Sequence, residues 1–175
     1  MKKLRKMLGS ADSPHILSLM RLIETQSKTT IANWCIDYAQ KEILPIYETA
    51  FPDDSRPRDA ITAAREWLAG NLKLPAVKKL ILDAHAAARE AEDHPAAQAA
   101  ARTAGQAAAC VHTPTHSLGL SFYGAAAIAY SRVGLNESDV VYEQIAAEET
   151  AKMESALRAV AVENEPNPAK IKWYC

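Results

Sequence analysis

Two successive segments with hardly any large polar side chain constrain the fold more than any other feature of this sequence. Residues 95–112 and 114–133 are small or apolar almost all the way round, as the stretches AAQAAARTAGQAAAC and GLSFYGAAAIAY show. Alanine has the highest helix propensity, and a helix that is apolar on every side belongs in the interior of a domain. We therefore predict two central helices, which can approach closely because Ala and Gly leave little side chain between backbones.

Prolines mark further places where helices can begin, since the first helical position needs no backbone donor and favours the φ angle that proline fixes. Five prolines fit this use: Pro14, Pro57, Pro75, Pro95 and Pro114. Apolar residues three and four apart predict four amphipathic helices, marked by Ile16, Leu19, Met20 and Ile23; by Ile31, Trp34, Cys35 and Tyr38; by Ile61, Ala64 and Leu68; and by Val77, Ile81, Ala84 and Ala88.

The C-terminal part of the chain predicts one more long helix and then an extended tail. Gly134 is a helix stop, and Asn136 with Asp139 forms an N-cap signal for a helix of roughly 137–163. The tail ENEPNPAKIKWYC contains two prolines that end the helix. We therefore expect a helical domain over residues 1–163 and a tail over 164–175 that either packs back on the domain or contacts a partner.

Length and composition favour a single all-α domain. A chain of 175 residues with 49% hydrophobic residues and only six glycines can bury one sizeable core and has few chain breakers. We predict a bundle of six to seven helices with two central Ala-rich helices. The related stretches AITAARE and AHAAARE also allow an arrangement of stacked helical hairpins.

Charge and cysteine usage limit the partners and the compartment. The net charge of −1 gives no overall field that would attract nucleic acid or an anionic membrane, and no apolar run is long enough to span a bilayer. The basic start MKKLRKMLGS lacks the unbroken apolar stretch of a signal peptide. Cys35, Cys110 and Cys175 form no CxxC pair, so we expect reduced thiols in a cytoplasmic protein.

Several ionisable residues fall among apolar neighbours on the predicted helices, where a charge needs a partner. The candidate polar cluster consists of Glu42, Arg65, His85, Arg89, Arg102, His116 and Glu149. Two interpretations are open. The cluster is either a ligand pocket, with histidine as acid or base and a carboxylate orienting it, or an internal salt-bridge network, for example Arg102 with Glu149, that fixes the helix packing.

The motifs of common enzyme classes do not occur. No GxGxxG, GxxxxGK[ST], GxSxG or HExxH is found, which disfavours nucleotide-binding loops, serine hydrolases and zinc proteases. His112 and His116 lie on either side of a predicted helix break, where Thr113 can cap the second helix, so their spacing does not place them on one helical face. We expect no metal and no cofactor.

The charge is unevenly distributed along the chain. Residues 137–165 contain eight acidic and two basic side chains, a net charge of −6 against +5 for the remainder. Glu143 and Glu154 project away from the predicted apolar stripe, and together with Trp173 and Tyr174 they form a candidate partner surface. The alternative is a solvated helix face, although an acidic rim can also steer a basic protein into a complex.

An ordered series of segments resembles a known family. The segments are LPIYE (44–48), RPRDAITAAREWLAG (56–70), AHAAARE (84–90), AAARTAGQAAAC (99–110), HTPTHSLG (112–119) and FYGAAAIAY (122–130). In this order they resemble the bacterial immunity-protein family whose domain is termed immunity-protein-five-like. The resemblance implies an all-helical, non-catalytic, cytosolic protein that neutralises a cognate toxin.

Two further hypotheses accompany this resemblance. The first is a small-molecule-binding protein or enzyme that uses the polar cluster. The second concerns assembly, because Ala-rich helices can pair between chains as readily as within one, so a homodimer is possible.

Overall fold

The computed structural model describes residues 3–174, and all regular secondary structure in this range is helical. The helices are α1 (Pro14–Ile23), α2 (Lys28–Tyr38), α3 (Leu44–Ala50), α4 (Arg56–Leu68), α5 (Leu74–Glu90), α6 (Pro95–Ala109), α7 (Ser117–Val133) and α8 (Asp139–Val160). A π-helical turn (Ala39–Ile43) joins α2 to α3 in one continuous rod, and a short 3₁₀ turn (Pro114–His116) precedes α7. The described residues therefore form seven helical rods, and the predicted all-α fold is confirmed.

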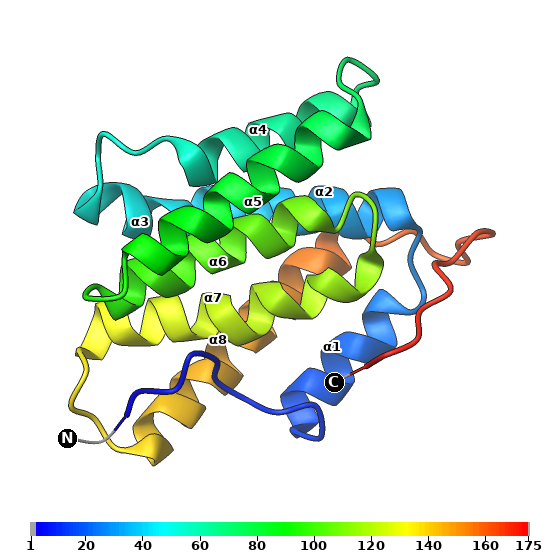
Figure 1. The fold of residues 1–175 in the computed structure, drawn as a ribbon. Coiled ribbons are helices and arrows are strands. Elements are labelled where there is room, and N and C mark those ends of the chain that lie inside the picture. Colours follow the sequence, from blue (N-terminus) through cyan, green and yellow to red (C-terminus); the bar gives the residue numbers. More distant parts are fainter. Residues whose placement is uncertain (1–2, 175) are drawn as a thin grey trace.

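Helix α6 lies at the centre of the bundle (Figure 1). It packs between α5 and α7 and also contacts α3, α4 and α2. From α4 to α8 each helix packs against the next one along the chain, so the fold is a series of adjacent helical hairpins. Helix α1 covers α8 on the far side. In the described part of the chain, no helix combines the length and the apolar character needed to cross a membrane.

The alanine-rich helices form the interior, as their sequence predicts. Ten of the fifteen residues of α6 and eleven of the seventeen residues of α7 are buried. Two glycines permit the closest approaches. A Cβ atom on Gly105 would lie 2.7 Å from Cε1 of His85, and a Cβ atom on Gly119 would lie 2.6 Å from Cβ of Gln106. Both distances are shorter than van der Waals contact, so α5, α6 and α7 pack this closely only because these positions lack a side chain.

The π-helical turn changes which residues of the second rod face the core. The amide of Leu44 bonds to the carbonyl of Ala39, five residues earlier, and Pro45 follows without any amide hydrogen to donate. A π turn accommodates one extra residue and rotates the helix that follows. As a result Ile43 is fully buried, whereas the side chain of Glu42 is 44% exposed. The prediction that Glu42 faces the interior was therefore wrong.

Helix ends follow the predicted signals with small differences. All five prolines named above lie in the first turn of a helix or of the 3₁₀ turn. The last helix is shorter than expected and ends at Val160. Ser138, and not Asn136 or Asp139, caps its start, because the Ser138 hydroxyl accepts a hydrogen bond from the amide of Val141 at 3.3 Å.

Residues 161–174 contain no helix and lie against the loop between α1 and α2. The buried side chain of Gln26 accepts a hydrogen bond from the amide of Val162 at 2.7 Å. Further along, the amide of Ala169 donates to the carbonyl of Gln26 at 2.8 Å. The indole of Trp173 donates to Glu24. These bonds place the tail beside the first two helices.

Two cysteines that are far apart in sequence meet in the core. Cys35 on α2 and Cys110 at the end of α6 are both free and fully buried. Burial, followed by the neighbouring Cys110 thiol, raises the pKa of Cys35 above its ordinary value, so the thiol form is favoured. Cys175 lies outside the described residues.

Candidate functional site

The seven residues of the predicted polar cluster lie in three separate places. Glu149 and Glu42 lie beside the C-terminal half of α7. Arg65 lies on α4 and bonds to α2 and the π turn, with Asp37 at 2.7 Å and the amide oxygen of Gln40 at 2.7 Å. The other four, His85, Arg89, Arg102 and His116, lie on a face formed by α5, α6 and the start of α7. The structure therefore contains no single internal cluster of all seven.

Glu149 is the most deeply buried of these ionisable residues. Its side chain is 4% exposed and accepts hydrogen bonds from Arg132 at 2.6 Å and from Lys152 at 2.7 Å. Burial acts to raise the pKa of Glu149, but the bonds from Lys152 and Arg132 outweigh burial and lower it. The predicted pair of Arg102 with Glu149 does not form. Lys152 lies three residues from Glu149 and could have been proposed from helix spacing, whereas Arg132 is brought in by the packing of α7 on α8.

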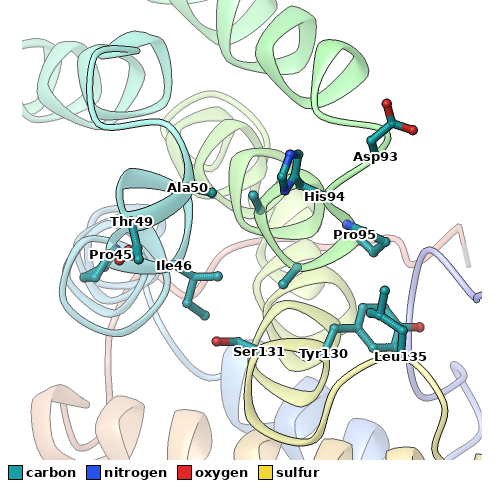
Figure 2. A pocket seen from close by; sticks show the side chains of 12 residues that line it. Pro45, Ile46, Thr49, Ala50, Asp93, His94, Pro95, Tyr130, Ser131 and Leu135 are labelled. Atoms are coloured by element: carbon teal, nitrogen blue, oxygen red, sulfur yellow. The ribbon is translucent and has the colours of Figure 1, made fainter.

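A groove runs between α3 and α7 next to this ion pair. Its first part is a hollow of about 500 Å³, lined in Figure 2 by Pro45 and Thr49 on one side and by Tyr130 and Ser131 on the other, with His94 and Pro95 at the start of α6. A second hollow of about 450 Å³ shares Ile46 and Ser131 with the first. The two hollows therefore adjoin at these residues, and we refer to them together as the groove.

The second hollow contains the polar end of the groove. Tyr38, Glu42, Arg132, Glu149 and Lys152 line it. Burial, followed by the charges of Glu149 and Glu42, raises the pKa of Tyr38 to about 12, so the phenol stays protonated near neutral pH. Because two cations already bond to the Glu149 carboxylate, Glu149 is not free to accept a proton from a substrate. The other carboxylate of the hollow, Glu42, is 44% exposed and lies 3.3 Å from Nζ of Lys41. Among residues 3–174, no group of three or more His, Cys, Asp or Glu side chains could hold a metal ion.

The remaining candidates belong to a continuous surface that we name the histidine face, defined by His85, Arg89, Arg102, His112, His116 and Tyr123. His85 lies directly on the backbone of α6 at Gly105. Nδ1 of His116 is 2.8 Å from Oε1 of Gln106, and the rings of His112 and His116 are 5.7 Å apart, edge to face. The guanidinium of Arg102 lies 6.0 Å from the centre of the Tyr123 ring.

The 3₁₀ turn explains why His112 and His116 meet despite the helix break. Thr113 does not cap the turn through its side chain, contrary to the prediction. Its hydroxyl instead lies 2.7 Å from Nδ1 of His112. The tight turn of Pro114–His116 then folds the second ring back toward the first. The sequence spacing alone gave no indication of this contact.

The three histidines of the face have lowered pKa values, which favours their neutral form at pH 7. Burial lowers the pKa of His85, and the charges of His116, Arg102 and Arg89 lower it further. Burial also lowers the pKa of His112, with added contributions from His116 and Lys78, and burial alone lowers the pKa of His116. Besides burial, the groups that act on these rings are arginine, lysine and a neighbouring histidine, so the face combines imidazoles of lowered pKa with positively charged side chains.

These pKa shifts predict that the fold loses stability in mild acid. The unfolded chain binds protons on histidine below about pH 6.5, and the folded chain binds them only at lower pH, so the free energy of unfolding falls as the pH drops through this interval. Urea unfolding at pH 7.0, 6.0 and 5.0 measures the effect. The double variant His85→Gln/His116→Gln should show a shallower decrease, and a wild-type protein more stable at pH 5.0 than at pH 7.0 would contradict the prediction.

Comparison with known proteins identifies the family. A family model described as "Imm-5 like putative immunity protein" matches residues 21–156. The chain belongs to this family. No curated protein and no solved structure matches the chain. The matched range of this immunity-family chain contains the whole histidine face and the groove between α3 and α7, but not the N-terminal segment or the tail.

The two glutamates of the predicted partner surface of this immunity-family protein have a different environment from the one expected. Glu143 and Glu154 do not project freely. Glu143 pairs with Arg5 and accepts a hydrogen bond from the amide of Gly9 at 3.2 Å. Glu154, with a side chain 14% exposed, bonds to Arg158 at 2.6 Å and accepts from Ser18 at 3.0 Å. The spacing of apolar residues in the sequence predicted that both residues point to solvent, but the N-terminal segment and α1 cover that side of α8.

The two aromatic residues of the predicted partner surface have different environments. Trp173 is partly buried against the core and bonded to Glu24. Tyr174 is 87% exposed. In the tail of this immunity-family protein, the ring of Tyr174 is therefore exposed to solvent, while the ring of Trp173 packs against the rest of the chain.

Proposed function

We propose that this protein is a cytoplasmic bacterial immunity protein that binds a cognate toxin and neutralises it without catalysing a reaction. The match of the family model over residues 21–156 is the observation that carries the proposal. The buried ion pair of Glu149 supports it, because paired internal charges stabilise a rigid body and leave recognition to the exterior. An interface buries about 800 Å² on each partner, a small part of the 9004 Å² of accessible surface on this chain.

Co-expression tests the proposal in cells. Each toxin encoded beside the gene is expressed with and without this protein, and we expect growth to be restored for one of them. The purified pair should elute together in size-exclusion chromatography. Absence of both rescue and complex with every neighbouring toxin would refute the proposal.

Titration distinguishes neutralisation from catalysis. An inhibitor that masks a toxin should abolish toxin activity in vitro at about a 1:1 molar ratio, as expected for one stable interface per pair. An enzyme that modifies or detoxifies would act at a small fraction of that ratio. Complete protection at one hundredth of the toxin concentration would therefore contradict a non-catalytic mechanism.

The groove favours a second candidate function, a small-molecule-binding protein or an enzyme. Its polar end brings together Tyr38, Glu42 and the Glu149 ion pair around a hollow of about 450 Å³. This candidate requires a ligand that replaces Lys152 or Arg132 at the carboxylate. Removing the groove groups with Tyr38→Phe/Glu42→Gln should leave toxin rescue unchanged if the immunity proposal holds, and loss of rescue with an intact fold would favour the groove.

A further inference from the structure

The arginines of the histidine face differ from most others in the chain. Within residues 3–174, ion pairs engage Arg5, Arg56, Arg58, Arg65, Arg132 and Arg158 with carboxylates. Three arginines have no such partner: Arg21, Arg89 and Arg102. Two of these three lie on the histidine face. Guanidinium groups form strong bidentate bonds with carboxylates. Arg89 and Arg102 are therefore available to bind a carboxylate of a partner, whereas the six paired arginines already bind carboxylates of this chain.

Arg102 is held in place without a carboxylate. Its guanidinium lies over the ring of Tyr123 and donates a hydrogen bond to Oε1 of Gln98 at 3.4 Å. Gln98 in turn donates to the carbonyl of Ala88 at 2.9 Å. Contacts of this kind restrict the side chain before binding, so less conformational entropy is lost when a partner arrives.

The surroundings of the two arginines carry both signs of charge and are partly apolar. Glu90 follows Arg89, whose charge helps to lower the Glu90 pKa, and Glu92 lines a hollow together with Arg102. Lys78 extends the charge along α5 and contributes to the field at His112. Leu82, one turn after Lys78, is 66% exposed. No carboxylate contributes to the pKa shifts of the three histidines. A mixture of arginine, tyrosine, histidine and exposed leucine is typical of the residues that dominate the energy of protein interfaces.

Close helix packing brings the residues of this surface together. Gly105 and Gly119 allow His85 and Gln106 to lie on the neighbouring backbones and not stand above them. The partly buried rings of His112 and His116 continue the same surface across the 3₁₀ turn. A pre-organised face of this kind suits a protein partner, since little conformational entropy is lost when a folded surface binds to it.

We infer that the histidine face is the docking surface of this protein and that its occupant is a carboxylate-rich patch on the toxin. The inference rests on the proposed function and names the surface that performs it. Charge complementarity supports the choice, because Arg89, Arg102 and Lys78 form no ion pair with a carboxylate in the described part of the chain, and carboxylates of a partner can pair with them. A nucleic acid is disfavoured, since the whole chain carries a net charge of −1 and residues 137–165 carry −6.

Charge reversal tests the surface. The variant Arg89→Glu/Arg102→Glu is compared with Arg21→Glu/Lys28→Glu, a matched change at two exposed cations of α1 and α2 that have no carboxylate partner. We expect the Kd for the toxin to rise about 100-fold or more for the first variant, as for loss of central arginine contacts, and less than about threefold for the second. The milder Arg89→Gln/Arg102→Gln should give an intermediate loss, and circular dichroism with urea unfolding checks that each variant folds.

Three outcomes are distinguishable. If the wild-type protein forms no complex with any neighbouring toxin, the proposed function fails. If the wild type binds and Arg89→Glu/Arg102→Glu binds equally well, the proposed function stands and the histidine face is overturned. If wild-type protein binds 20-nucleotide single-stranded or double-stranded oligonucleotides and only this binding is lost in the variant, the carboxylate-rich protein partner is overturned in favour of nucleic acid.

Salt dependence provides an independent reading of the same surface. Wild-type affinity for the toxin should fall between 50 mM and 300 mM NaCl, because ions screen the exposed arginines. The Arg89→Gln/Arg102→Gln variant should show a shallower dependence than the wild type. Equal salt dependence in the two proteins would show that these arginines do not contact charged groups of the partner.

Discussion

Replacing Trp34 with alanine is expected to lower the free energy of unfolding by about 3–5 kcal/mol, the range for deletion of a buried aromatic side chain. Trp34 on α2 is 3% exposed, and its indole Nε1 donates a hydrogen bond to the carbonyl of Met153 on α8 at 3.0 Å. The substitution removes this bond and leaves a cavity between two helices that are far apart in sequence. Urea unfolding followed by circular dichroism measures the loss.

Trp173 supplies the matched control for the same chemical change. It is only partly buried, and it lies in the tail beyond the last helix. Trp173→Ala should therefore cost about 1 kcal/mol, as for a partly exposed position. Trp34→Phe, which keeps most of the buried area but not the hydrogen bond, should fall between the two. Equal losses for Trp34→Ala and Trp173→Ala would contradict the arrangement of α2 against α8.

Removing both cations from Glu149 is the second change with a large expected effect. The double variant Arg132→Gln/Lys152→Gln leaves a buried carboxylate without a positive partner, which should lower the free energy of unfolding at pH 7 by about 3 kcal/mol. In the wild type these cations lower the pKa of Glu149 against the effect of burial. Without them burial raises the pKa, so protonation in the folded state should recover part of the loss as the pH falls toward 5.

A third substitution separates the charge effect from general damage. Adding Glu149→Gln to the double variant removes the stranded charge, so the triple variant should be more stable at pH 7 than the double variant. Its stability should also change less between pH 7 and pH 5. A triple variant as unstable as the double variant would show that lost packing of the long cationic side chains, and not the carboxylate, accounts for the loss.

The candidate site was only partly predictable from the sequence. Helical spacing accounts for the bond between Arg102 and Gln98 on α6, because residues four apart share a face in any α-helix. The same reasoning failed at Glu42, since Glu42 lies within the π turn, which changes the helical register. It correctly placed His112 and His116 on either side of a helix break, but it could not predict their ring contact, which depends on the backbone path of a 3₁₀ turn.

The expectation that Glu143 and Glu154 project freely was wrong for a different reason. The acidic residues of α8 were correctly located on one helix, and their net charge is a property of the sequence. Whether Glu143 and Glu154 are available depends on which segments cover them, and Arg5 and Ser18 come from parts of the chain more than 130 residues away. Helical spacing relates residues of one helix and gives no information about such distant contacts.

The sequence by itself determined that the chain is helical, where most helices begin, and that the two alanine-rich segments lie at the centre. These features depend on local propensity, on the missing amide hydrogen of proline and on the periodicity of apolar residues, all of which act within a few positions of the chain. Only the tertiary structure decided that Arg132 joins Lys152 at Glu149 while Arg89 and Arg102 form no ion pair with a carboxylate. The pairing of charges depends on which helices become neighbours, and that is set by packing across the whole domain.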